Sequence, residues 1–179
     1  MTGRSAVIAP IVLPSRLAIL RDAADPLAAR GVPAHVTVLF PFLAVDALTP
    51  TVRSTLAGLA AMHPPFVAPF SRVERWEEMV WLVPAGQRPF LDLTLAVAAL
   101  WPDHPPYEGV HESLIAHLTL VETTDRQARD AAWAAAVEVG PFDVAVRELT
   151  VITETESGNW RTRWRLPLGN RTTRKPSAP

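Results

Sequence analysis

Two short segments of the sequence place a histidine and a threonine two residues apart. They read AHVTV at 34–38 and AHLTL at 116–120, so each has the form apolar-His-apolar-Thr-apolar. On a β-strand, side chains two residues apart point to the same face, roughly 6–7 Å from each other. The pattern therefore predicts that each segment projects an imidazole beside a hydroxyl, with apolar residues on the opposite face.

The residue types suit acid–base chemistry at phosphorus. Histidine titrates near neutral pH, so one of His35 and His117 can accept a proton while the other donates one. The hydroxyls of Thr37 and Thr119 can donate hydrogen bonds to phosphate oxygens. If the two strands pack symmetrically, these side chains line one cleft and support in-line displacement without a metal, each proton transfer contributing ~10²–10⁴-fold. The residues alone do not say which histidine is the base.

Two other interpretations of the motifs remain. Each histidine could be a satisfied, half-buried strand residue, although the same pattern at matching places in both halves favours a shared site. Alternatively, the chain could be a module that binds a phosphorylated ligand without turning it over. That module would show saturable nucleotide binding and no product.

The composition narrows the chemistry further. The chain of 179 residues contains no cysteine, which excludes disulfide bonds, a cysteine nucleophile, iron–sulfur clusters and cysteine-ligated zinc. With 17 basic and 18 acidic side chains, its net charge of −1 gives no overall attraction to nucleic acid or to an anionic membrane. The length suits one domain that buries its own core, and we expect a monomer with no obligate protein partner.

Metal and membrane sites are not expected. The remaining histidines, His63, His104 and His111, lack the short spacing of a zinc site, so no metal or cofactor is predicted. The apolar stretch Ala6–Leu13 is too short to span a bilayer and has no adjacent signal-peptide cleavage site. We therefore expect a cytoplasmic protein without membrane contact.

The elements that must position the motifs follow from the apolar periodicity. Strands are predicted at 6–13, 35–43, 66–76, 79–83, 114–122, 142–153 and 160–168. Helices are predicted at 15–29 with a break at Asp25-Pro26, at 48–62 with Thr49 or Asp46 as N-cap, at 89–100, and at 125–138 with Thr124 or Asp125 as N-cap.

The order of these elements repeats. In each half, the strand that carries His-x-Thr is followed by a helix and then by two strands. The repeat predicts an α+β fold in which two pseudo-symmetric lobes with antiparallel-rich sheets flank a central cleft, with helices outside. Residues 1–168 would form this single domain, with the motifs at 35–37 and 117–119, and the polar tail 169–179 is expected to be disordered.

The two motifs resemble those of the two-histidine (2H) phosphoesterase superfamily, which includes 2′-5′ RNA ligases and RNA 2′,3′-cyclic phosphodiesterases. The hallmark of that superfamily is a pair of His-x-Thr/Ser motifs between apolar residues. The segments HVTVLFPF (35–42) and WPDHPPYEG (101–109) are also similar to it. The resemblance extends over roughly residues 6–168.

The resemblance implies metal-free hydrolysis of a cyclic phosphodiester, with 2′-5′ RNA ligation or cleavage as the alternative. It makes His35 and His117 the acid–base pair, and Thr37 and Thr119 phosphate binders. Glu122 stands where RNA-directed relatives often have a basic residue, and phosphate contacts dominate the binding of long RNA. The expected substrate is therefore a small cyclic nucleotide or an RNA 2′,3′-cyclic phosphate end.

Tyr107, Arg161 and Arg163 are further candidate substrate contacts. Tyr107 lies in the Pro-rich loop before the second motif, where it could stack on a base or belong to a surface turn. Arg161, Arg163 and Arg165 alternate with two tryptophans in WRTRWR (160–165), which predicts one basic and one aromatic face. The basic face could line the phosphate cleft or be solvated.

Overall fold

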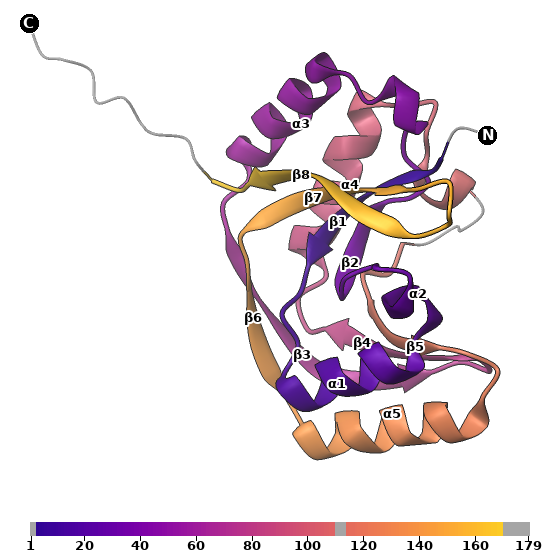
Figure 1. Cartoon of the computed structure of the whole chain (residues 1–179). Helices are drawn as coiled ribbons and strands as arrows, with labels where there is room; N and C mark the ends of the chain where they lie inside the picture. The colour runs from indigo at the N-terminus through magenta and orange to yellow at the C-terminus, as the bar shows by residue number, and fades with distance from the viewer. Residues whose placement is uncertain (1–2, 110–113, 170–179) are drawn as a thin grey trace, which may run out of the picture.

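The strands of the described chain build two sheets. The computed structural model describes residues 3–109 and 114–169, and within these ranges the strands form two antiparallel sheets of four. The first sheet has the order β2-β1-β7-β8, and the second β5-β4-β3-β6 (Figure 1). The bounds in the first sheet are Ser5–Pro10 (β1), His35–Leu39 (β2), Glu148–Glu154 (β7) and Trp160–Pro167 (β8). Those in the second are Phe66–Arg75 (β3), Met79–Pro84 (β4), Leu118–Glu122 (β5) and Phe142–Val146 (β6).

Helices cover one face of each sheet. Their bounds are Ser15–Ala24 (α1), Pro26–Ala29 (α2), Pro50–Met62 (α3), Arg88–Leu100 (α4) and Arg126–Val139 (α5), with a short 3₁₀ turn at Val45–Ala47. Helices α3 and α4 pack on the first sheet, and α1 and α5 on the second (Figure 1). The predicted α+β fold with two antiparallel sheets and outer helices is confirmed.

The helix boundaries follow local capping. The side chain of Thr49 accepts a hydrogen bond from the Val52 N–H at the start of α3, and Asp125 accepts from two N–H groups at the start of α5. Both satisfy donors that the first turn of a helix leaves free. The predicted break at Asp25-Pro26 is also present, because α1 ends at Ala24 and α2 begins at Pro26.

The sheets do not correspond to the two halves of the sequence. The hairpin β3–β4 follows the first His strand in the chain but pairs with β5, the second His strand. The hairpin β7–β8 follows the second His strand but completes the sheet of β2. This exchange leaves both His strands at sheet edges, and the two edges, β2 and β5, contact each other.

Alternation divides the apolar residues between the two faces of each sheet. On the first sheet, Val7 belongs to the main core under the helices, whereas Ile8 belongs to a smaller cluster on the opposite face. On the second sheet, Val80 faces the main core and Trp81 the opposite side. Thr37 pairs with Ile8, and Thr119 with Trp81, so both threonines lie on faces turned away from the main core.

One predicted strand is wrong. The segment 142–153 forms two strands, β6 and β7, separated at Arg147. Val146 pairs with Phe66 in the second sheet, while Leu149 pairs with Leu166 in the first. The segment is rich in apolar and β-branched residues on both sides of the charged pair Arg147-Glu148. A charged pair also occurs within single strands, so the pattern alone does not indicate where the chain leaves one sheet for the other.

Three strand ends also differ from prediction. β1 ends at Pro10 itself, and β2 ends at Leu39, two residues before Pro41. Proline has no N–H to donate to a ladder. β5 begins at Leu118 rather than at 114. Of the predicted tail, residues 170–179 lie outside the described residues, and the N–H of Gly169 donates to the Ala60 carbonyl. No helix in the described ranges has both the length and the apolarity needed to cross a membrane.

Candidate active site

Both motif histidines are held in the same way. The Nδ1 atom of His35 lies 2.7 Å from the Pro33 carbonyl oxygen, and that of His117 lies 2.8 Å from the Ile115 carbonyl oxygen. A carbonyl oxygen only accepts, so Nδ1 is the donor in each ring. This contact fixes the tautomer and leaves Nε2 of each half-buried imidazole as the atom available for proton transfer.

The fold brings the two motifs together. The edge strands β2 and β5 contact each other, and the charge of His117 contributes to the pKa of His35. A small cavity of about 20 Å³ has residues of the first motif and of the segment leading into the second in its lining. Thr37, Tyr107, Ile115 and Ala116 are among them.

The surroundings of His35 favour its neutral form. Burial lowers the pKa of His35 to about 4, and the positive charges of Arg21 and His117 act in the same direction. The hydrogen bond to the Pro33 carbonyl opposes this shift without cancelling it. At neutral pH the His35 Nε2 is therefore an unprotonated acceptor, 3.2 Å from the Thr37 hydroxyl oxygen.

Tyr107 extends the polar chain beyond Thr37. Its hydroxyl hydrogen-bonds with Thr37, and burial raises the pKa of Tyr107, so the phenol stays protonated. The residue has φ 51°, in the left-handed region, and its N–H donates to the Phe40 carbonyl at 2.8 Å. Non-glycine residues adopt this conformation at a cost of about 1–2 kcal/mol. The turn Pro106–Gly109 thus places the phenol against the first motif.

The second motif has apolar neighbours. The Thr119 hydroxyl lies 3.4 Å from the Met79 sulfur, a weak acceptor. The ring of Trp81 meets His117 edge to face, with 5.3 Å between centroids. Trp76 packs on Trp81 at 5.3 Å and remains 59% exposed.

A buried ion pair supports the segment before His35. The Arg21 guanidinium lies 2.9 Å from the Asp25 carboxylate and also donates to the Val32 carbonyl at 2.9 Å. Both side chains are almost fully buried, so removing one partner would leave an uncompensated charge. Sequence reasoning missed this pair; the available signal was an Arg and an Asp four residues apart beside a predicted helix break.

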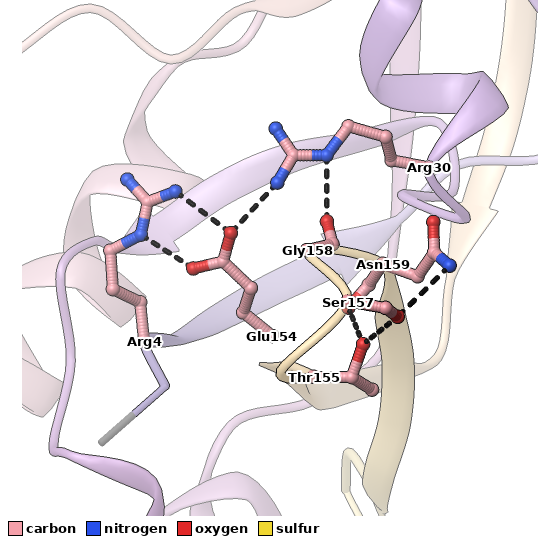
Figure 2. Close-up of polar contacts among 7 residues, drawn as sticks. All are labelled: Arg4, Arg30, Glu154, Thr155, Ser157, Gly158 and Asn159. Carbon is pink, nitrogen blue, oxygen red and sulfur yellow. Dashed lines mark hydrogen bonds and ion pairs between the residues drawn. The ribbon is translucent and has the colours of Figure 1, made fainter. Parts of the chain in front are cut away.

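A second polar cluster joins three distant segments near the first motif. Figure 2 shows the Glu154 carboxylate between the guanidinium groups of Arg4 and Arg30, each 2.8 Å away. Arg30 also donates to the Gly158 carbonyl at 2.6 Å, and its own carbonyl accepts from the Trp160 N–H. These contacts tie the β7–β8 turn to the loop that leads into His35.

The arginines of β8 do not form one basic face. The register of β7 and β8 shifts between Val151 and Ile152, so Trp164 pairs with Val151 and Trp160 with Glu154. Trp164 then packs on the main core and Trp160 on the smaller cluster of the other face. The predicted division into an aromatic and a basic face is wrong, because the bulge reverses the alternation.

These arginines are also not among the residues that line the small cavity beside Thr37 and Ala116. Arg161 lines a separate cavity of about 1200 Å³, together with Gly3, Arg4 and Glu154 among others. Arg163 is exposed, with its guanidinium over the Trp164 ring at 5.8 Å. Arg165 pairs with Glu148 at 2.9 Å.

Phe40 lies on the face of Thr37, although strict alternation along the strand would place it on the face of Val36 and Val38. A register irregularity in the pairing of β1 with β2 lets Leu39 follow Val7 into the main core. Phe40 consequently packs on the smaller cluster, on the side of Thr37, instead of opposite to it. The Arg4 guanidinium lies over the Phe40 ring at 5.7 Å and over the Trp160 ring at 5.8 Å.

Of the other histidines, His63 and His104 lie in the described part of the chain and make their contacts elsewhere. Across residues 3–109 and 114–169, no three His, Asp or Glu side chains are grouped so as to hold a metal ion. His63 caps the end of α3, and the N–H of His104 donates to the Trp101 carbonyl. His111 lies outside the described residues.

Comparison with known proteins agrees with this arrangement. The chain matches the sequence model of the 2′-5′ RNA ligase superfamily over residues 10–158, most of its length, and it therefore belongs to that family. No curated protein sequence matches it. Membership, together with the fold, defines an enzyme of the phosphoesterase or ligase type within the 2H phosphoesterase superfamily, as the motifs predicted.

Solved structures with this fold are distant in sequence. The TT0787 protein of Thermus thermophilus is 16% identical, with a TM-score of 0.61, over 94% of this chain and 99% of that one. LigT of E. coli in complex with 3′-AMP is 20% identical, with a TM-score of 0.56, over 93% and 98%. The same protein with NADP⁺ gives 22% identity and a TM-score of 0.58, over 93% and 98%. At these identities the likeness concerns the fold.

Proposed function

We propose that this protein is a metal-independent phosphoesterase that hydrolyses a cyclic phosphodiester, the 2′,3′-cyclic phosphate of a nucleotide or RNA end. The observation that carries the proposal is the matched pair of imidazoles. Each donates Nδ1–H to the carbonyl two residues before it, which leaves Nε2 as the proton-exchanging atom. In His35 the substrate would take the place of the Thr37 hydroxyl at Nε2 when that hydroxyl turns to the phosphate. Two such rings on adjoining strand edges can serve as one base and one acid.

The lowered pKa of His35 supports giving this residue the role of base in the proposed reaction. Because that pKa is lowered to about 4, His35 is neutral in the free enzyme and takes a proton from the attacking water at Nε2. His117 takes part as the imidazolium, protonated on both ring nitrogens, and gives its Nε2 proton to the ribose oxygen as the bond from that oxygen to phosphorus breaks. Water thus supplies the new phosphorus–oxygen bond, and the product is a phosphomonoester. Exchange of protons with solvent restores both rings. In ligation the two roles would be reversed.

The threonines and the distribution of arginine support a small substrate. Thr37 and Thr119 lie on the faces turned from the main core and can donate to the non-bridging phosphate oxygens. Arg161 lines a different cavity, and Arg165 is paired with Glu148. We therefore favour a mononucleotide or a chain end over a long RNA, whose binding needs several phosphate contacts.

Incubation with 2′,3′-cyclic nucleotides in the presence of a metal chelator tests the proposal. We expect phosphorus NMR to show ring opening, with turnover reduced ~10²–10⁴-fold in both His35→Ala and His117→Ala. His63→Ala, a histidine outside the motifs, is the matched control and should retain full activity. Full activity in both motif variants would overturn the assignment. Saturable nucleotide binding without product would instead support a binding module.

A further inference from the structure

The second motif lacks a strand neighbour where the first motif has one. In the first sheet, the residue before the histidine, Ala34, accepts a backbone hydrogen bond from the Ile11 N–H at 2.9 Å. In the second sheet, Leu82 pairs with Leu118, so the antiparallel register brings Pro84 opposite Ala116. Proline has no N–H. The ladder therefore cannot continue to Ala116, and β5 begins only at Leu118.

A side chain occupies the place of the missing neighbour. The Nε2 of Gln87 donates to the Ala116 carbonyl at 3.0 Å, and its Oε1 accepts from the Ala116 N–H at 2.7 Å. A hydrogen-bonded pair in an antiparallel ladder exchanges one donor and one acceptor in this manner. The amide of Gln87 thus supplies both of the contacts that a strand residue with an N–H would supply.

The contact reaches the catalytic ring through one peptide group. The N–H of Ala116 and the carbonyl of Ile115 belong to the same planar peptide unit. That carbonyl is the group that holds the Nδ1 of His117. Gln87 therefore fixes the plane of the peptide that orients the imidazole, and a hydrogen bond at its N–H polarises its carbonyl as an acceptor.

Gln87 itself is held firmly. Its backbone carbonyl accepts from the N–H groups of Phe90 and Leu91, both at 3.1 Å, at the start of α4. The residue is half-buried. A side chain anchored to a helix start in this way can hold its partner in one geometry.

We propose that Gln87 is a positioning residue of the second motif. Its side-chain amide makes the backbone contacts to Ala116 that Pro84, which has no N–H, does not make, and it thereby orients His117 for proton transfer. The inference rests on the proposed function for its catalytic consequence, because the acid to be oriented is His117. Its structural part, the restraint of the peptide 115–116, is measured independently of activity.

Gln87→Met removes both contacts while keeping the length of the side chain. We expect kcat to fall roughly 10- to 100-fold, as for a misplaced catalytic group, with KM little changed. Amide hydrogen exchange at Ala116 should accelerate, and nitrogen NMR of His117 should show a mixture of tautomers. The matched control is Gln127→Met, the other glutamine, exposed on the first turn of α5, which should change none of these.

Gln87→Glu separates positioning from general stability. An ionised carboxylate accepts from the Ala116 N–H but cannot donate to its carbonyl, whereas a protonated carboxyl can do both. Relative to the wild type at each pH, kcat of this variant should recover as the pH falls from 7 towards the ordinary Glu pKa of about 4.3. The kcat of Gln87→Met relative to the wild type should not change with pH.

The outcomes distinguish the two proposals. If the wild type opens no cyclic phosphodiester, the function fails, while Ala116 exchange and the His117 tautomer still test the role of Gln87. Unchanged exchange at Ala116 in Gln87→Met would overturn that role. The role of Gln87 would also be overturned if Gln87→Met had the same kcat per folded molecule as the wild type. The same holds if the kcat of Gln87→Glu, divided by that of the wild type, did not change with pH. Should Gln87→Met fail to fold, the pH ratio of Gln87→Glu decides.

Discussion

Around His35 the neighbours are polar or charged, whereas around His117 they are largely apolar. Buried Arg21 lies behind the first motif, and Thr37 links His35 to the phenol of Tyr107. At the second motif the indole of Trp81 meets the imidazole edge to face, and the Thr119 hydroxyl contacts the Met79 sulfur. The imidazoles are nevertheless held by the same carbonyl contact. Identical motifs can thus be given different roles by what surrounds them.

The leaving group offers the largest test of that difference. If His117 is the acid, His117→Ala should lose ~10²–10⁴-fold on a 2′,3′-cyclic nucleotide but far less on a 4-nitrophenyl phosphodiester. The reason is that nitrophenolate departs without a proton. His35→Ala should be impaired on both substrates. Comparison of kcat/KM for each variant on each substrate checks this prediction. If His35→Ala, rather than His117→Ala, is the variant little impaired on the 4-nitrophenyl phosphodiester, then His35 is the acid and His117 the base.

The pH dependence tests the first motif alone. Below its pKa, His35 is protonated and cannot act as a base, so kcat/KM should fall about tenfold per pH unit below that point. With the pKa of His35 lowered to about 4, the acid limb should lie near pH 4. The charged or titrating groups that bear on the ring are Arg21, His117 and, through Thr37, Tyr107.

The prediction is checked by measuring kcat/KM as a function of pH and by titrating the His35 ring by NMR. An acid limb at the ordinary histidine value of about 6.5 would contradict the difference between the motifs. The raised pKa of Tyr107 keeps its phenol protonated throughout this range.

The threonines should differ by a smaller factor. Thr37→Val removes the hydroxyl that bonds both the Tyr107 phenol and the His35 Nε2, in addition to losing a phosphate donor. An unsatisfied buried group costs about 1–3 kcal/mol, so kcat/KM should fall roughly tenfold or more. Thr119→Val loses only the phosphate donor and should cost a few-fold. Thr37→Ser, which keeps the hydroxyl, is the control; equal losses at both positions would remove the asymmetry.

The smallest effect is expected for the arginines of β8. Arg161→Ala and Arg163→Ala should change kcat/KM for 2′,3′-cyclic mononucleotides by less than about twofold, because exposed charges away from the reacting atoms contribute little. The same variants assayed on a cyclic-phosphate oligonucleotide show whether a chain extends towards them. A large loss on the mononucleotide would place these residues at the site after all.

The residues of the two motifs could be predicted from the alternation of side chains along a single strand. The other contacts of the site depend on how the strands pair, which the sequence does not show. The pairing of His35 with Thr37 follows from period two along a strand, which is a property of neighbouring residues. The separation of Trp160 from Trp164 follows from a bulge, which the sequence does not mark. Gln87 lies far from His117 in sequence, and its role appears only because Pro84 falls opposite Ala116.

The exchange of hairpins between the halves has a consequence for synthesis of the chain. All strands of the second sheet lie between Phe66 and Val146, so this sheet can close while the chain is still emerging. In the first sheet, β1 pairs on one side with β2 and on the other with β7, which comes much later. Until β7 forms, β1 is an unprotected edge of apolar residues. The first sheet, which contains His35, is therefore the one more exposed to mispairing in the nascent chain. The site of the two histidines is complete only after β7 has paired with β1.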